Sequence, residues 1–298
     1  MADSPLRVAI AGAGGRLGAA LVREYSKDFR VLAFNRAQLD LAAPEQMKRT
    51  LAAAEFDILI NCAAQTNVDR CEMHREEAFA INAEAPRLLA EICAGKGARL
   101  IHISTDYVFD GAGRGPYREE DEARPISVYG ESKLAGEQRV LTVSDRHLVA
   151  RVSWVFGPDR PSFVDWVIAQ AREKDAVSAV ADKISTPTYT LDIAQMLQPF
   201  FNSETDGGII HLANRGACSW QEYGQWALDC CTEIGLPLRA RTVDPITLSD
   251  MKNFIAPRPV YTVLATDKFE RLTGIAPRDW HEAVADYLRA HARLTANA

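Results

Sequence analysis

The sequence predicts an α/β fold built on a doubly wound parallel sheet, with a smaller second α/β domain. Three observations lead to this fold class. Short apolar runs alternate with segments of helical periodicity through the first half, the apolar runs are continuous, and a glycine-rich turn follows the first of them. Continuous apolar strands are typical of a parallel sheet that helices cover on both faces.

The predicted elements alternate in a regular order up to residue 152. We expect strands at 6–11, 30–34, 57–62, 99–104 and 147–152. Helical periodicity predicts helices at 17–25, 44–54, about 71–93 and 128–141, and Pro44 stands near a helix start, where proline is favoured. A later helix at 190–201 and a strand at 209–213 also fit the sheet domain.

The second half of the chain changes character, because polar and proline-containing stretches interrupt shorter elements. We therefore expect a discontinuous arrangement of two domains. Residues 1–156 and about 187–214 would form a dinucleotide-binding domain. About 157–186 and 215–298 would form a substrate-binding domain.

Composition and charge limit the classes of protein. The 298 residues are 47% hydrophobic and 25% charged, which is enough to bury a core, and the net charge of −6 without a basic block argues against nucleic acid as a partner. No apolar run is long enough to cross a bilayer and the first residues lack a signal-peptide layout, so we expect a cytoplasmic protein without membrane contact. The six cysteines form no CxxC pair, so we interpret them as reduced thiols and expect no metal site.

The glycine-rich turn carries the first functional signal. Gly12, Gly15 and Gly18 follow the first strand and open a helix, where such glycines allow a tight turn, a close approach of pyrophosphate and close helix packing. The alternative is a merely tight turn between strand and helix. The GxxGxxG spacing resembles the short-chain dehydrogenase/reductase superfamily, which implies a Rossmann-type domain that binds a nicotinamide cofactor.

The end of the second strand indicates which cofactor. It reads Phe34-Asn35-Arg36, without the carboxylate that usually holds the ribose 2′-hydroxyl of NAD. Arg36 is suited to a 2′-phosphate, although a solvated surface arginine is the simpler alternative. The sequence therefore favours NADPH, with NADH as the second choice.

A catalytic group follows the fourth strand. Thr105 stands at the strand end, and Tyr129 and Lys133 lie four residues apart, on one face of a predicted helix. Carbonyl reduction needs a proton donor, and a lysine cation nearby is expected to lower the pKa of a phenol from its usual value of about 10. The alternative, a surface tyrosine near a surface lysine, does not explain why this pair follows the glycine turn and the Ser-Thr strand end.

Several stretches resemble one family closely. They are residues 61–72, 102–111, 129–137, 151–157 and 258–264. They are similar to the dTDP-4-dehydrorhamnose reductases, extended short-chain reductases of rhamnose biosynthesis that supply cell-surface polysaccharide, and the resemblance runs from residue 6 to about 288. It implies NADPH-dependent reduction of the 4-keto group of a dTDP-linked 6-deoxyhexose, with Thr105, Tyr129 and Lys133 as the catalytic triad.

The resemblance also implies binding residues. Those for the cofactor are Gly12, Gly15, Arg16, Leu17, Gly18, Asn35, Arg36, Asp40, Leu41, Ala63, Ala64, Gln65, Thr66, Asn82, Tyr129 and Lys133. Those for the substrate are Val68, Thr105, Asp106, Tyr107, Tyr129, Trp154 and Arg258, with Pro187 and Thr188 as weaker candidates near the nucleotide. The alternatives are a core aromatic for Trp154 and a solvated loop cation for Arg258.

The chain departs from the family pattern in two places. Ala20 and Leu191 stand where some relatives have acidic residues that hold magnesium at a dimer contact, so we expect no such metal and either a monomer or a homodimer. Ala13 and Gly14 replace a Lys-Thr-like pair in the glycine turn, which leaves phosphate binding intact but removes side-chain contacts.

Two rival functions stay open. One is another nucleotide-sugar reductase, an epimerase or a dehydratase, although Tyr107 after Asp106 argues against the Asp-Glu pair of a dehydratase. The other is a non-catalytic NADP-binding regulatory subunit of the methionine adenosyltransferase type. The residues do not fix the sugar, the nucleotide base or the stereochemistry of the product.

Overall fold

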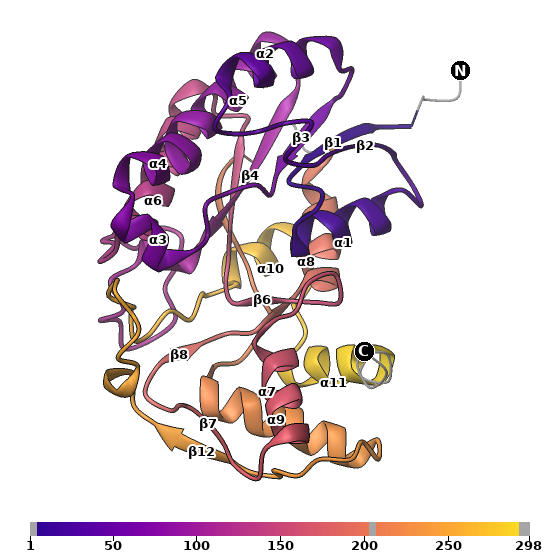
Figure 1. Ribbon diagram of the computed structural model, residues 1–298. Helices are drawn as coiled ribbons and strands as arrows, with labels where there is room; N and C mark the ends of the chain where they lie inside the picture. Colours follow the sequence, from indigo (N-terminus) through magenta and orange to yellow (C-terminus); the bar gives the residue numbers. More distant parts are fainter. Residues whose placement is uncertain (1–4, 203–206, 292–298) are drawn as a thin grey trace.

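The computed structural model describes residues 5–202 and 207–291, and its centre is a six-stranded parallel sheet (Figure 1). The strand order is β10-β5-β4-β3-β1-β2. The strands are β1 (Arg7–Ala11), β2 (Arg30–Phe34), β3 (Ile58–Asn61), β4 (Arg99–Thr105), β5 (Leu148–Val152) and β10 (Gly208–Leu212). The α/β fold class and the parallel sheet are confirmed.

Helices cover both faces of this sheet because its strands alternate apolar side chains between two cores. Val8 and Ile10 of β1 belong to one core, and Ala9 and Ala11 belong to the other. The first core also takes side chains from α1 (Arg16–Tyr25), α8 (Thr190–Leu197) and α10 (Asp267–Thr273). The second takes them from α2 (Pro44–Ala53), α5 (Ala85–Gly95) and α6 (Val128–Val143).

The predicted helix at 71–93 is wrong as a single element. The chain forms α3 (Val68–Met73), α4 (Arg75–Phe79), the π-helical turn η1 (Ala80–Glu84) and then α5. His74 leaves the helical conformation, with φ −132° and ψ 64°, which separates α3 from α4. Likewise, the helix predicted to reach residue 201 ends at Leu197, and the 3₁₀ turn η3 (Gln198–Phe200) follows.

The rest of the chain packs below the sheet around shorter elements (Figure 1). The helices α7 (Phe163–Glu173), α9 (Trp220–Glu233) and α11 (Trp280–His291) share one apolar core, and α7 and α9 also cover the parallel pair β7 (Val177–Val180) and β12 (Val243–Ile246). The remaining elements are β6 (Val155–Phe156) paired with β9 (Thr188–Tyr189), β8 (Ile184–Ser185) paired with β11 (Cys218–Ser219), and the 3₁₀ turns η2 (Asp106–Val108) and η4 (Leu248–Asp250).

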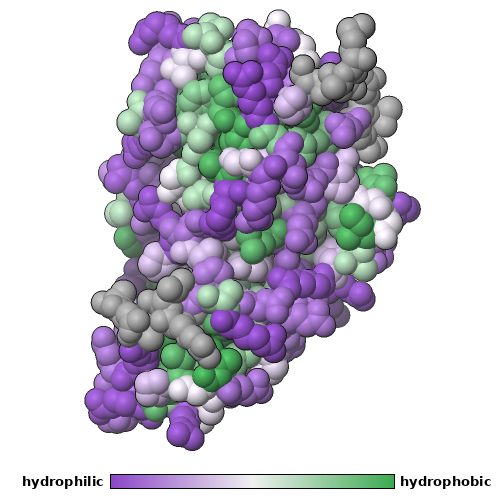
Figure 2. Space-filling view, turned by 90° about the vertical axis from the view of Figure 1, so that its right-hand side faces the viewer, coloured by the Kyte–Doolittle hydropathy of each residue, from purple (hydrophilic) through white to green (hydrophobic). Residues whose placement is uncertain are grey.

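One face of the molecule carries both polar and apolar side chains. On the face in Figure 2, apolar side chains form separate patches between hydrophilic ones. Among the described residues, no helix combines the length and apolarity of a membrane span.

The strand order fixes where a ligand binds. The chain passes from β1 outward to β2 and then returns to β3 on the other side of β1. The connections after β1 and β3 therefore diverge, and ligands of doubly wound sheets bind in the crevice at this point, beyond the carboxyl ends of the strands.

Candidate active site

A cavity of about 940 Å³ lies at this crevice and reaches from the glycine turn to helix α6, which carries Tyr129 and Lys133. Most of the predicted site residues line it. They are Gly12, Gly15, Arg16, Leu17, Asn35, Arg36, Asp40, Leu41, Ala63, Ala64, Gln65, Thr66, Thr105, Asp106, Tyr129, Lys133 and Trp154. The lining also includes residues that the sequence did not single out, which are Gly14, Ala37, Leu39, Cys62, Ile81, Ile103, Ser104, Val152, Val155 and Arg160.

The glycine turn is shaped for a dinucleotide. Gly12 has φ +78°, and a Cβ there would lie 2.8 Å from the backbone nitrogen of Ala63. Gly18 does not line the cavity. It packs against the turn so closely that a Cβ there would lie 2.2 Å from the carbonyl oxygen of Gly12. Helix α1 has no side-chain cap and no acidic residue in its first turn, so its first N–H groups are available to an anion. These features fit the pyrophosphate of a nicotinamide cofactor.

Two arginines flank this turn. Arg16 was predicted as a cofactor residue, and its guanidinium donates to the carbonyl oxygens of Val155, Arg160 and Pro161, at 3.1, 3.2 and 2.5 Å. Arg160 in turn donates from Nε to the Gly14 carbonyl oxygen at 2.8 Å. The loop at 155–161 is thereby held against the turn, and Arg160 adds a cation where the family's Lys-Thr-like pair is missing.

The predicted 2′-phosphate residue lies at the exposed rim of the cavity. The Arg36 side chain is 80% exposed, and its Nε lies 3.6 Å from Oδ2 of Asp40. Asp40 thus places a carboxylate near Arg36, although the strand end itself carries none. Asn35 shapes the turn between them, because its Oδ1 accepts from the backbone nitrogens of Ala37 and Gln38.

The catalytic candidates come together from two elements. Thr105 is the last residue of β4, and Tyr129 and Lys133 lie in the first half of α6. Ser127 begins α6 by accepting from the backbone nitrogen of Gly130. All three catalytic side chains are buried at the inner end of the cavity.

The pKa of the tyrosine moves opposite to expectation. Burial raises the pKa of Tyr129 well above its usual value, and the hydrogen bond with the Thr105 hydroxyl opposes this rise. Burial also lowers the pKa of Lys133 to about 8, against the attraction of Glu137. The Lys133 Nζ lies 2.7 Å from the Ile103 carbonyl oxygen and 3.3 Å from Nε2 of His102, so the lysine is held against β4.

Asp106 connects Thr105 to residues that come later in the chain. Its Oδ1 accepts from the Thr105 hydroxyl at 3.1 Å, and its Oδ2 accepts from Ser153 at 2.9 Å and Ser185 at 3.2 Å. Thr262 donates to Ser185 at 3.0 Å. Sequence reasoning found Asp106 but not Ser153 and Ser185, because these partners lie 47 and 79 residues further along the chain and have no motif of their own.

Of the predicted substrate residues, Trp154 lines the cavity, whereas Val68, Tyr107 and Arg258 lie outside its lining. Val68 and Tyr107 pack against the apolar cluster that contains Tyr129, and the rings of Tyr107 and Tyr129 are 5.6 Å apart. Trp154 is half-buried between β5 and β6, where it lines the cavity and packs against Tyr223. Its φ of +39° is a conformation that costs about 1–3 kcal/mol in non-glycine residues and that recurs at functional sites.

Arg258 is not a solvated loop cation. Its guanidinium binds both carboxylate oxygens of Asp69 at 2.8 Å, and its side chain is 8% exposed. The Cζ atom of Arg258 also lies over the ring of Phe254, 4.3 Å from its centroid. Because Asp69 neighbours Val68 in α3, this pair holds residues 255–258 against that helix.

The remaining predicted residues act behind the cavity surface. Asn82 uses its amide to bind both the backbone nitrogen and the carbonyl oxygen of Gln65, at 2.8 and 3.0 Å, and so fixes the loop after β3. Pro187 and Thr188 are buried, and the Thr188 backbone nitrogen donates to the Trp154 carbonyl oxygen at 3.2 Å.

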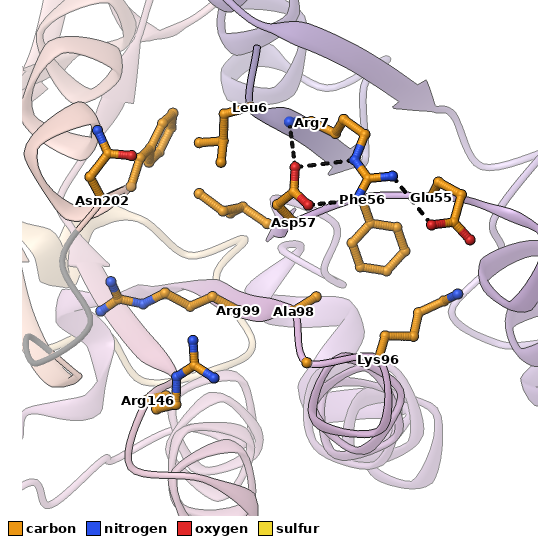
Figure 3. Close-up of a pocket in the computed structure, with 13 residues that line it drawn as sticks. Leu6, Arg7, Glu55, Phe56, Asp57, Lys96, Ala98, Arg99, Arg146 and Asn202 are labelled. Carbon is orange, nitrogen blue, oxygen red and sulfur yellow. Dashed lines mark hydrogen bonds and ion pairs between the residues drawn. The ribbon is translucent and has the colours of Figure 1, made fainter. Parts of the chain in front are cut away.

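A second cavity of about 500 Å³ lies at the opposite ends of β1, β3 and β4 (Figure 3). Arg7 projects along one wall, where its guanidinium pairs with Asp57 at 2.6 Å and Glu55 at 3.2 Å. Across residues 5–202 and 207–291, no cluster of three or more His, Cys, Asp or Glu side chains is arranged to hold a metal.

The parallel sheet, the glycine turn and the buried Thr105, Tyr129 and Lys133 define a nicotinamide-dependent oxidoreductase of the short-chain dehydrogenase/reductase class. Residues 6–293 match the model of the RmlD substrate binding domain. The chain belongs to this family.

Individual relatives cover nearly the whole chain. The dTDP-4-dehydrorhamnose reductase of Mycolicibacterium smegmatis is 39% identical over 289 residues, which are 95% of this chain and 85% of the relative. A probable dTDP-4,6-dihydroxy-2-methyloxan-3-one 4-ketoreductase of Streptomyces antibioticus is 37% identical and covers 94% of both chains. The crystal structure of the Bacillus anthracis dTDP-4-dehydrorhamnose reductase in complex with NADP superposes with a TM-score of 0.89, at 32% identity, covering 96% of this chain and 99% of that one.

Proposed function

We propose that this protein reduces the 4-keto group of a dTDP-linked 6-deoxyhexose with NADPH, converting dTDP-4-dehydrorhamnose to dTDP-L-rhamnose. The observation that carries the proposal is the cavity that joins the glycine turn to Thr105, Tyr129 and Lys133. Relatives that cover nearly the whole chain carry the name of this reductase, and a solved one binds NADP.

The chain supplies most of the cofactor site from its own backbone. The N-terminus of α1 and the glycine turn take the pyrophosphate, with Arg16 and Arg160 beside it. Arg36, at the exposed rim, takes the 2′-phosphate. The nicotinamide cofactor, when bound, supplies the hydride.

The catalytic side chains hold the substrate oxygen and move its proton. Thr105 orients the keto oxygen when its hydroxyl hydrogen, which points to Asp106 in the free protein, turns to that oxygen. The Tyr129 hydroxyl gives its proton to the oxygen as negative charge develops there. Lys133 lies one turn along α6 and replaces that proton. Val68, Tyr107 and Trp154 surround the sugar on its apolar sides.

The test is NADPH oxidation at 340 nm with dTDP-4-keto-6-deoxy-L-mannose made in a coupled assay, for the unmodified protein and for Tyr129→Phe. A general acid contributes about 10²–10⁴ to the rate, so turnover should fall by that factor while NADPH affinity changes little. Full turnover in Tyr129→Phe would refute the assignment of the acid.

The same assay separates the rival functions. No oxidation with this substrate, but oxidation with another dTDP-linked keto sugar, would move the protein to the reaction named for the Streptomyces antibioticus relative. Tight NADPH binding without turnover on any keto sugar, together with capture of a methionine adenosyltransferase, would favour the regulatory-subunit alternative.

A further inference from the structure

A buried chain of polar groups stands behind the catalytic lysine. The Ala63 backbone nitrogen lies 3.1 Å from Oδ1 of Asn61, and the Asn61 Nδ2 lies 3.1 Å from Nδ1 of His102. The His102 Nε2 then lies 3.3 Å from Nζ of Lys133. Asn61 and His102 have no solvent exposure and Lys133 has 2%, so protein atoms alone set the direction of these bonds.

The direction of each hydrogen bond follows from the Ala63 backbone nitrogen, whose role as a donor is fixed. A backbone nitrogen only donates, so Oδ1 of Asn61 accepts from Ala63 and the amide Nδ2 faces His102. Since Nδ2 also only donates, Nδ1 of His102 has to accept. Burial holds the pKa of His102 well below its usual value, and a neutral imidazole that accepts at Nδ1 carries its hydrogen on Nε2.

This hydrogen points at Lys133. The Lys133 Nζ already donates to the Ile103 carbonyl oxygen at 2.7 Å. An ammonium has no lone pair with which to accept from His102, so two N–H groups would oppose each other at 3.3 Å. A neutral amine satisfies both contacts, because it donates to Ile103 and accepts from His102.

We infer that Asn61 holds His102 as its Nε2–H tautomer, and that His102 thereby favours the neutral amine of Lys133. Asn61 and His102 are positioning residues, since they act through the lysine. Glu137 on α6 faces Lys133 with the opposite effect, and it is itself bound by Arg151 at 2.7 Å. Cys62 also faces Lys133, as a thiol, because burial raises its pKa to about 12.

The consequence for the reaction rests on the proposed function. After the Tyr129 hydroxyl has protonated the substrate oxygen, the ammonium of Lys133 transfers one proton to the Tyr129 phenolate. This step gives a neutral phenol and a neutral amine, so charge and protons balance. His102 stabilises the amine product of this transfer, which makes Lys133 a proton source and not only a fixed positive charge.

The tautomer is measurable in the unmodified protein by long-range ¹H–¹⁵N NMR of labelled histidines. Two other buried histidines supply internal references. His147 accepts at Nδ1 from the Leu100 nitrogen and contacts the Ala90 carbonyl oxygen through Nε2, so it is the Nε2–H form. His211 contacts the Ala265 carbonyl oxygen through Nδ1 and Arg151 through Nε2, so it is the Nδ1–H form.

We expect the His102 spectrum to match that of His147. A match to His211 overturns the inference whether or not the protein reduces any sugar. If the spectrum matches His147 but no keto sugar is reduced, the tautomer stands and the proposed function fails, so the two failures are distinguishable.

The second experiment changes the tautomer with the nearly isosteric Asn61→Asp. A carboxylate accepts at both oxygens, so it keeps the Ala63 contact and takes a hydrogen from Nδ1 of His102, which frees Nε2 to accept from Lys133. We expect the His102 spectrum to change to the His211 pattern and Lys133 to bind its proton at least tenfold more tightly, as read from a ¹³Cε-lysine titration assigned with Lys133→Met. A changed tautomer without tighter proton binding would refute the effect on the lysine. Should Asn61→Asp fail to fold, the spectrum of the unmodified protein still decides the tautomer.

Discussion

The pair of Asp69 and Arg258 provides a direct test of how residues 255–258 are held against α3. Asp69 accepts four hydrogen bonds from residues 255–258, of which two come from the backbone nitrogens of Ile255 and Ala256, at 2.9 Å each. The other two come from Arg258 at 2.8 Å. The change Asp69→Asn keeps the shape of the side chain but replaces one acceptor oxygen with a donor that faces Arg258.

The magnitude follows from burial and charge. A hydrogen bond to a charged group contributes about 1.5–3 kcal/mol when water is largely excluded. Arg258 is 8% exposed and Asp69 is 25% exposed, so we expect a loss of about 2 kcal/mol for this loop, which is roughly a 30-fold rise in its open population. Hydrogen exchange of the Ile255 and Ala256 amides should accelerate by that factor.

The chain supplies a matched control. Asp175 and Arg239 form a two-oxygen ion pair of similar geometry, at 2.8 Å, but their side chains are 81% and 57% exposed. Exposed pairs contribute about 0–1 kcal/mol, so Asp175→Asn should change stability little. If both variants had equal, small effects on unfolding in urea, burial would not be what strengthens the Asp69 contact.

Acid gives the same pair a pH signature. Arg258 and the two backbone nitrogens hold the pKa of Asp69 well below its usual value. A carboxyl with a depressed folded-state pKa stabilises the protein fully above its unfolded pKa, about 3.9, and loses this contribution as pH falls through the folded value. The difference in stability between the unmodified protein and Asp69→Asn should therefore narrow below about pH 4.

Two further predictions concern the cofactor and the core. Arg160→Gln should weaken the binding of NADPH and NADH about equally, since both cofactors contain the pyrophosphate. Arg36→Gln should weaken the binding of NADPH alone, by about tenfold for one lost ion pair with phosphate. Equal selectivity between the two cofactors in both variants, measured by fluorescence titration, would contradict this division. Glu137→Gln should lower the free energy of unfolding by about 3–5 kcal/mol, because Arg151 and Glu137 are only 2% and 1% exposed and the buried arginine would lose its counter-charge. A loss below about 1 kcal/mol, measured by unfolding in urea, would contradict this prediction.

Local sequence patterns were sufficient to predict most of the fold and the centre of the candidate site. The strands were predictable because a buried parallel strand is a continuous apolar run, and Tyr129 and Lys133 were predictable because their spacing places them on one helix face. The break at His74 was missed because apolar periodicity continues across it. Arg160 was missed because its partner, Gly14, is 146 residues away in sequence.

The charge state of the site was also beyond sequence reasoning. Tyr and Lys four apart suggest that the cation lowers the pKa of the phenol. In the fold, burial dominates both groups, and it raises the pKa of Tyr129 while lowering that of Lys133. The size of such burial effects depends on how closely other segments pack over the helix, which no local motif encodes.

The hydrogen bonds around Asp106 also set an order of events in synthesis. Thr105 and Asp106 leave the ribosome early, whereas Ser185 and Thr262 follow about 80 and 156 residues later. Because ribosomes add residues in sequence, the hydrogen bonds around Asp106 can be completed only after Thr262 has emerged, and the first core of the sheet only after Phe269 of α10. The surroundings of the candidate active site are thus among the last parts of the nascent molecule to be completed.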